Sequence, residues 1–327
     1  MTDGPRPIVH RLPLDGGHVM HVEEHGDPAG LPALVLHGGP GSGSSPVLRR
    51  DFDARRYRII CPDQRGAGHS TPAGAITANT LADLLDDLRR LRDHLRIERW
   101  LVVGGSWGAT LALTHALDQP GAVAGLLLRN VFLARARDID GFFAKAVRHG
   151  DPEWCTLWSE AWRRQCPITD VIAENLAHGT PERQCRIAAL WFGWEQRMAT
   201  GRPASQPDDA TLQRLVTRYR VQSHYLRHGC WLRAPTLLER CAALPAVPTL
   251  IVHGTKDRLC PPQGARTLAH ALQGRAILRW VPGAGHDPTH PAIAAAMRQA
   301  LNDYALTQAF SGAGESAPGM RISAGAG

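Results

Sequence analysis

The sequence predicts an α/β fold in which a mostly parallel central sheet is flanked by helices. The chain has 327 residues, of which 43% are hydrophobic, enough for one large α/β unit or two smaller ones. Segments with helical periodicity alternate with short apolar runs that end mostly in Gly, Asp or Asn. Because these runs lack polar alternation, they are typical of parallel strands buried on both faces: residues 33–39, 57–63, 100–106, 125–130, 249–254 and 277–283.

One helix is clearly marked between the second and third apolar runs. Thr80 followed by Asp83 resembles an N-terminal capping signal. Leucines then recur at three- and four-residue steps, which gives the helix one apolar face: Leu81, Leu84, Leu85, Leu88, Leu91 and Leu95.

The strand runs disappear from about residue 135 to 240, where six of the nine tryptophans lie. We expect this segment to form a helical cap. Trp154, Trp158 and Trp162 follow one another at four-residue steps, which predicts that they share one helical face. That face either packs into the core of the cap or forms the aromatic wall of a substrate pocket.

These patterns divide the chain into four parts. Residues 1–134 and 241–309 form the two parts of the α/β core, and residues 135–240 form the inserted helical cap. Residues 310–327 are rich in Gly, Ala and Ser and have few large apolar groups, so we expect a disordered tail.

Composition excludes several classes of function. The 37 Lys and Arg residues exceed the 30 Asp and Glu residues, but they are dispersed, which argues against a nucleic-acid partner. Seven cysteines without a C-x-x-C pair suggest neither disulfides nor a zinc site, and no phosphate-binding glycine loop suggests a cofactor. No leader-like or membrane-spanning apolar run is present, so we expect a cytoplasmic protein without a membrane partner. The oligomeric state stays open.

The strongest chemical signal is the pattern G-x-S-x-G at residues 104–108. It lies between a buried-strand pattern and an apolar helix pattern, where a sharp turn would present the Ser106 hydroxyl at the edge of the sheet. Small neighbours avoid steric clashes in that turn. The N-terminus of the following helix favours negative charge developing there. We therefore predict that Ser106 is a nucleophile.

A serine hydroxyl needs a base that takes its proton and a carboxylate that orients the base. Asp257 and His286 each follow a strand run, so both are expected at the strand ends where Ser106 lies. The predicted acid is therefore Asp257 and the predicted base is His286. Other histidines are weaker alternatives for the base: His37, His224, His253 and His290.

The glycine-rich turn HGGPG at residues 37–41 follows the first apolar run. A tetrahedral intermediate needs two amide donors, and glycine lets the backbone approach closely. We expect the backbone N–H groups of Gly39 and Trp107 to form this oxyanion hole.

At this point the motifs carry a family resemblance. The chain resembles the proline iminopeptidase (prolyl aminopeptidase) family of serine peptidases in the α/β-hydrolase superfamily over roughly residues 8 to 305. The resemblance is carried by HGGPGSG (37–43), DQRGAGHS (63–70), GGSWGATLAL (104–113), LLLRNVFLAR (126–135), WFGWE (191–195), HGTKDRLCP and GAGH (283–286).

The resemblance implies an α/β-hydrolase fold whose helical cap closes over the free N-terminal end of a short substrate. It implies the same nucleophile, acid and base: Ser106, Asp257 and His286. It also implies that Asp63 and Arg65 are mainly structural and fix the loop beside the oxyanion turn.

Substrate recognition is implied at Trp194 and Glu195, which match a Trp-Glu pair in the cap of the family whose carboxylate holds the substrate ammonium group. A buried carboxylate over an apolar pocket is costly unless a cation pairs with it, which fits recognition of an amine. The alternative is an ordinary glutamate on a helix surface.

Two positions depart from the family pattern. Gln222 stands where the family has a second carboxylate, and Asn130 stands where the family has glycine after LLLR. A neutral amide still forms hydrogen bonds but forfeits a charge interaction, so a strongly cationic imino terminus should bind less well.

The leading hypothesis is a serine aminopeptidase that releases an N-terminal proline or other small residue from a peptide or an aminoacylated small molecule. The second is an esterase or amide hydrolase of secondary metabolism without strict amine recognition. A non-catalytic binding protein is disfavoured by the complete set of Ser106, Asp257 and His286. Epoxide and haloalkane hydrolysis are disfavoured because they require a carboxylate where Ser106 stands.

Overall fold

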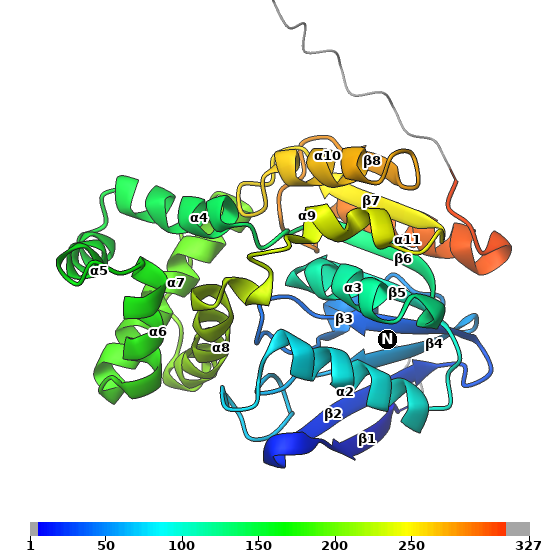
Figure 1. Cartoon of the computed structure of the whole chain (residues 1–327), viewed down its shortest axis with the longest axis horizontal. Helices are drawn as coiled ribbons and strands as arrows, with labels where there is room; N and C mark the ends of the chain where they lie inside the picture. Colours follow the sequence, from blue (N-terminus) through cyan, green and yellow to red (C-terminus); the bar gives the residue numbers. More distant parts are fainter. Residues whose placement is uncertain (1–5, 312–327) are drawn as a thin grey trace, which may run out of the picture.

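The computed structural model describes residues 6–311, and this part of the chain folds around one eight-stranded sheet (Figure 1). The strand order is β1-β2-β4-β3-β5-β6-β7-β8. β1 with β2 and β2 with β4 pair antiparallel, and all other neighbours pair in parallel. The strands are Ile8–Pro13 (β1), Val19–Gly26 (β2), Leu31–Leu36 (β3), Tyr57–Pro62 (β4), Trp100–Ser106 (β5), Val123–Val131 (β6), Thr249–Gly254 (β7) and Ile277–Val281 (β8).

All six apolar runs in the sequence form strands, so the prediction of a mostly parallel α/β sheet is confirmed. β1 and β2 were not expected, because neither is a continuous apolar run. In β2 the buried side chains of Met20, Val22 and Glu24 alternate with partly exposed ones. This two-residue period is typical of an antiparallel strand with one covered face.

Helices cover both faces of the sheet (Figure 1). Leu34 and Leu36 of β3 pack in one core cluster with leucines of α2 and α3, whereas Ala33 and Val35 pack in a second cluster with α11. The helices are Pro46–Arg49 (α1), Leu81–His94 (α2), Trp107–Asp118 (α3), Ala136–Arg148 (α4), Pro152–Arg163 (α5), Ile168–His178 (α6), Pro181–Thr200 (α7), Asp209–Arg227 (α8), Leu237–Arg240 (α9), Pro262–Ala271 (α10) and Pro291–Thr307 (α11), with 3₁₀ turns at Asp15–Gly17, Pro120–Ala122, Gly229–Trp231 and Cys241–Ala243.

Helix α2 confirms the helix predicted from the leucine pattern. The backbone N–H of Thr80 donates to Asp83 Oδ2 over 2.8 Å, and the N–H of Asp83 donates to Thr80 Oγ1 over 3.3 Å. These reciprocal bonds form the expected capping box and satisfy donors that have no partner inside the helix.

Helices α4 to α8 lie between β6 and β7 in the chain and stand beside one edge of the sheet, on the left of Figure 1. Trp154 is buried in their core, but Trp158 and Trp162 are 42% and 80% exposed. The prediction that these three tryptophans share one face is therefore wrong. Four-residue steps in a helix of 3.6 residues per turn drift by about 40° each, which carries Trp162 away from the face that Trp154 buries.

The expected tail lies mostly outside the described residues, since it includes 312–327. At its start, Phe310 is buried and its ring lies 5.2 Å from that of Tyr304. In residues 6–311 we find no helix whose length and hydrophobicity would let it span a bilayer.

Candidate active site

Ser106 stands at the junction of β5 and α3, in a backbone conformation that side chains rarely adopt. Its φ is 56° and its ψ is −123°. A Cβ on Gly104 would lie 2.2 Å from the carbonyl oxygen of Gly108, and a Cβ on Gly108 would lie 2.2 Å from that of Leu36. Both positions therefore require glycine, because the strand, the turn and the helix approach too closely for a side chain.

Asp257 and His286 meet at the ends of β7 and β8. The Nδ1 atom of His286 lies 2.8 Å from Asp257 Oδ2, which fixes the ring with its proton on Nδ1. The other carboxylate oxygen accepts the backbone N–H groups of Leu259 and Cys260 over 2.9 and 2.8 Å. The carboxylate is thus held by three donors, and the opposite ring nitrogen of His286 is left as an acceptor.

The electrostatics of Asp257 favour its charged form. Burial alone raises the pKa of this carboxyl, but the neighbouring His286 and the hydrogen bonds it accepts outweigh burial, so the pKa lies below its usual value. His253 also lies near, with Nε2 3.8 Å from Asp257. Burial lowers the pKa of His253, whose Nδ1 accepts the N–H of Val131, so this ring is neutral and points its remaining N–H at the Cys260 carbonyl.

Asn130 and Arg129 tie the loops that carry the acid and the base. Asn130 is fully buried with a φ of 46°, a conformation that asparagine tolerates well. Its Nδ2 donates to the Gly285 carbonyl over 2.9 Å, and its Oδ1 accepts the Gly254 N–H over 3.1 Å. Arg129 Nη1 donates to the His286 carbonyl over 3.1 Å. Asn130 therefore links the end of β7 to the loop of His286.

The glycine turn after β3 lies against Ser106. A Cβ on Gly38 would lie 3.6 Å from that of Ser106, and Gly39, with a φ of 110°, lines the same cavity. Trp107 is the first residue of α3, and its fully buried indole donates from Nε1 to Gln64 over 2.9 Å. Trp107 thus directly follows Ser106 in the chain, and Gly39 lines the cavity that Ser106 lines.

His37 is an internal brace of this turn. Its Nδ1 lies 2.9 Å from the Gly38 carbonyl, and its Nε2 accepts the Gln64 N–H over 3.0 Å. Both ring nitrogens are thereby occupied, and burial lowers the pKa of the imidazole. His37 is consequently a neutral structural residue, unsuited to act as the base.

Asp63 and Arg65 make structural bonds to neighbouring segments, in line with what the family resemblance implied. Asp63 accepts the backbone N–H groups of Ser44 and His69 over 2.5 and 2.7 Å. Arg65 is buried and donates to both oxygens of Asp87 over 2.6 and 2.7 Å.

A group of possible metal ligands lies at the same loop. The ligand atoms of His21, Asp63 and His69 all lie within 4.8 Å of one another. Both oxygens of Asp63 already accept backbone N–H groups. These bonds explain the buried carboxylate of Asp63 as a structural residue of the loop.

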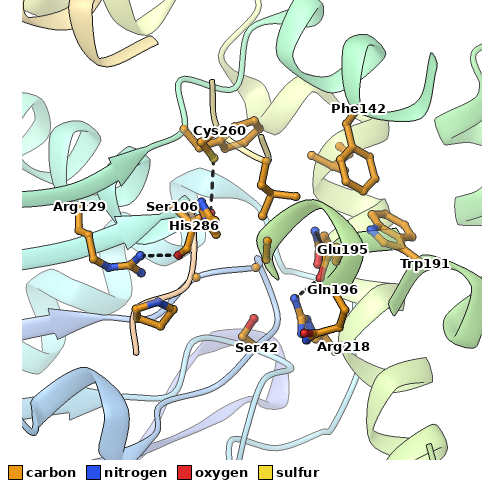
Figure 2. Close-up of a pocket in the computed structure, with 18 of the residues that line it drawn as sticks. Ser42, Ser106, Arg129, Phe142, Trp191, Glu195, Gln196, Arg218, Cys260 and His286 are labelled. Carbon is orange, nitrogen blue, oxygen red and sulfur yellow. Dashed lines mark hydrogen bonds and ion pairs between the residues drawn. The ribbon is translucent and has the colours of Figure 1, made fainter. Parts of the chain in front are cut away.

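A cavity of about 330 Å³ connects the two halves of the site (Figure 2). Ser106 and His286 line one end, and Glu195 and Arg218 line the other. Apolar side chains form much of the wall between them, four from the helices and one from the loop after β7: Ile139, Phe142, Trp191, Leu226 and Leu259. This volume lies at the lower end of the range found for small-molecule pockets.

The far end of the cavity is a polar cluster of α7 and α8. Glu195 Oε2 accepts hydrogen bonds from Arg218 Nη2 over 2.6 Å and from the Tyr219 hydroxyl over 3.0 Å. Glu195 Oε1 accepts the Gln222 side-chain N–H over 2.9 Å. We call Glu195, Arg218, Tyr219 and Gln222 the polar wall.

Of the three residues expected to bind substrate, Glu195 and Gln222 line the cavity, whereas Trp194 lies elsewhere. The Trp194 indole donates to the Phe142 carbonyl over 3.3 Å. Trp191, three residues earlier, lines the cavity instead and stacks on Tyr219 with ring centroids 4.8 Å apart. Both indoles pack near the Phe142 ring, so a three-residue step along α7 decides which of them reaches the cavity.

Comparisons with known proteins agree with this architecture. Residues 32–290 match the family model described as the alpha/beta hydrolase fold. The chain is 35% identical over 299 residues to a proline iminopeptidase of Arabidopsis thaliana, covering 87% of this chain and 76% of the relative. It is 36% identical over 300 residues to a proline iminopeptidase of Xylella fastidiosa (strain 9a5c), covering 87% of this chain and 93% of the relative.

A solved structure with the same fold is the proline iminopeptidase of Mycobacterium smegmatis, with a TM-score of 0.59 and 21% identity over 92% of this chain and all of the other. The chain therefore belongs to the α/β-hydrolase fold family and is a hydrolase. Within that class, its identity to the curated relatives places it in the proline iminopeptidase family.

Sequence reasoning missed Arg218 and the linking role of Asn130. Arg218 pairs with Glu195 across two helices, 23 residues away, and no local pattern signals such a contact. For Asn130 the sequence carried a weak signal, because asparagine, which tolerates a positive φ, stands there in place of the glycine of the family.

Proposed function

We propose that this chain is a serine aminopeptidase that releases an N-terminal proline or other small residue from a peptide or an aminoacylated small molecule. The observation that carries the proposal is the meeting of Ser106 and His286 in one small cavity, with His286 held by Asp257. Membership of the proline iminopeptidase family supports the reaction class.

In the proposed mechanism, Ser106 Oγ attacks the carbonyl carbon of the scissile amide while Nε2 of His286 takes its proton. The negatively charged Asp257 stabilises the resulting imidazolium. The backbone N–H groups of Gly39 and Trp107 stabilise the oxyanion of the tetrahedral intermediate. His286 then returns the proton to the leaving amine, which leaves an acyl-enzyme on Ser106. Water activated by the same histidine hydrolyses this ester.

We further propose that α4 to α8 act as a cap that selects the acyl group. Their contribution to the cavity combines apolar side chains with the polar wall at its far end. A Cβ on Gly41 would lie 2.6 Å from the Arg218 carbonyl, so α8 presses directly on the oxyanion turn. The cap and the reacting atoms are therefore close enough for the cap to select acyl residues by their size.

The proposal is tested with chromogenic amides of proline, alanine and N-acetylalanine and with a simple acyl ester. Release of the chromophore from the free aminoacyl amides, abolished in Ser106→Ala, is the expected result. A fluorophosphonate should label wild type at Ser106, as located by peptide mass spectrometry. Hydrolysis of the ester without hydrolysis of any aminoacyl amide would overturn the aminopeptidase assignment and favour the esterase hypothesis.

A further inference from the structure

The charge of Glu195 is already compensated inside the protein. Arg218 Nη2 lies 2.6 Å from Glu195 Oε2, and the carboxylate accepts two further hydrogen bonds, from Tyr219 and Gln222. A carboxylate has about four acceptor sites, so three of them are occupied before any substrate enters. An incoming ammonium group therefore meets an ion pair rather than a bare negative charge.

The rest of the cavity supplies no other free carboxylate. Among the described residues that line it, the acidic side chains are Asp138 and Glu195. Asp138 is bonded to Arg135 over 2.7 Å by each of two nitrogens. Arg129 adds a positive charge near Ser106. Since each negative charge has its own arginine, the lining has no net attraction for a cation.

Gln222 offers the polar contact that remains. A carboxylate only accepts hydrogen bonds, so the Gln222 nitrogen must face Glu195, and its Oε1 must face away. The side chain is 8% exposed and lines the cavity, and Oε1 is buried without a hydrogen-bond partner in residues 6–311. A buried acceptor left unpaired is costly, so a rotation of the Gln222 side chain that brings Oε1 to the cavity surface, where it meets a donor on the substrate, would be favoured.

We propose that Arg218 determines the acyl specificity of this enzyme. By neutralising Glu195, it makes the pocket recognise a small acyl residue through a hydrogen bond to the uncharged Gln222 Oε1. The substrate class is then a small 2-amino or 2-hydroxy acyl group, without a preference for the positive charge of the amine. This inference rests on the proposed serine hydrolase function and narrows its substrate.

The test uses three isosteric p-nitroanilides at the same pH. Alanyl anilide carries an ammonium group, lactoyl anilide an uncharged hydroxyl donor, and propanoyl anilide no donor. In wild type we expect kcat/KM for lactoyl and alanyl anilides to agree within about tenfold. We expect propanoyl anilide to be about tenfold poorer than lactoyl anilide, because it lacks one neutral hydrogen bond.

Arg218→Met should then expose Glu195 and convert the pocket to one that prefers a cation. The ratio of alanyl to lactoyl kcat/KM should rise at least about tenfold, through a lower KM for alanyl anilide, since a charge-assisted bond replaces a neutral one. Gln222→Glu adds a carboxylate by another route and should shift the ratio in the same direction. The control is Arg214→Met, an exposed arginine one turn earlier on α8, which should leave the ratio unchanged.

The outcomes separate the two proposals. A wild-type preference for alanyl over lactoyl anilide above about 100-fold would overturn the role of Arg218. So would Ser106-dependent hydrolysis with an unchanged ratio in both Arg218→Met and Gln222→Glu. Lactoyl turnover by Arg218→Met verifies that this variant is folded, and Gln222→Glu carries the test if it is not. Hydrolysis of none of the anilides by wild type would overturn the aminopeptidase function and the inference together.

Discussion

The strand-end region around Ser106 and the polar wall on α7 and α8 are built in different ways. Around Ser106 the backbone itself is constrained, because Gly104 and Gly108 leave no space for a Cβ and Ser106 has a positive φ. The polar wall consists of side chains projecting from two regular helices, and Gly193 of α7 has open space around it.

This difference determines which substitutions each region tolerates in evolution. A substitution on a regular helix exchanges one side chain and leaves the backbone in place, so Arg218 and Gln222 can alter recognition without disturbing Ser106. A substitution in the strand-end region disturbs several packed segments together. We therefore expect the first region to govern whether the reaction occurs and the second to govern which acyl group reacts.

The largest expected effect is at the proposed nucleophile. Ser106→Ala should lower kcat by at least about 10⁴-fold for every substrate, because the attacking atom is lost while little volume changes. His286→Ala should be similar, and the double variant should be hardly worse than either, since both groups act in one unit. Steady-state kinetics check this, with thermal unfolding as the control for folding. Residual turnover within tenfold of wild type would contradict a serine mechanism.

Matched glycine substitutions compare the two regions directly. Gly108→Ala would place a Cβ 2.2 Å from the Leu36 carbonyl oxygen, so we expect the free energy of unfolding to fall by about 3 kcal/mol or more. Gly193→Ala meets no atom within 4 Å in a helix interior and should raise it by about 0.5–1 kcal/mol. Urea unfolding of both variants measures the difference. Equal effects would show that backbone constraint does not distinguish the regions.

Glu195→Gln should change which substrate reacts rather than abolish the reaction. The substitution leaves the Arg218 cation without its partner at the cavity wall, so kcat/KM for alanyl anilide should fall about 10- to 100-fold. Lactoyl anilide should lose about threefold or less, because a neutral hydroxyl is indifferent to that charge. The measurement is kcat/KM for both anilides in wild type and variant. An equal loss for both anilides would show that the polar wall does not select the substrate.

The sequence predicted the parallel sheet because each buried strand is a local apolar run. It also predicted the meeting of Asp257 and His286, since the carboxyl ends of adjacent parallel strands share one sheet edge. Neither inference needs knowledge of distant contacts, because chain order and strand direction suffice.

The polar wall could be predicted only in part. Glu195 and Gln222 were found through their resemblance to family positions, but the pairing with Arg218 depends on the rotation of α7 and α8 about their axes. Trp194 was misplaced for the same reason, because one short step along α7 turns its indole away from the cavity. Helix periodicity fixes which residues share a face and leaves open what that face meets.

The smallest expected effect on catalysis is at Asn130, a buried side chain of the strand-end region. Asn130→Gly keeps a positive φ accessible but removes the bonds to Gly285 and Gly254, so the free energy of unfolding should fall by about 1–2 kcal/mol. Asn130→Ala loses the same bonds and adds backbone strain, so it should be less stable by about 1 kcal/mol more. Because these bonds join the loops of Asp257 and His286, kcat should fall a few-fold for alanyl and lactoyl anilides alike. Unfolding curves and the two kcat values measure both effects; a shift in the alanyl-to-lactoyl ratio would show that Asn130 takes part in acyl selection after all.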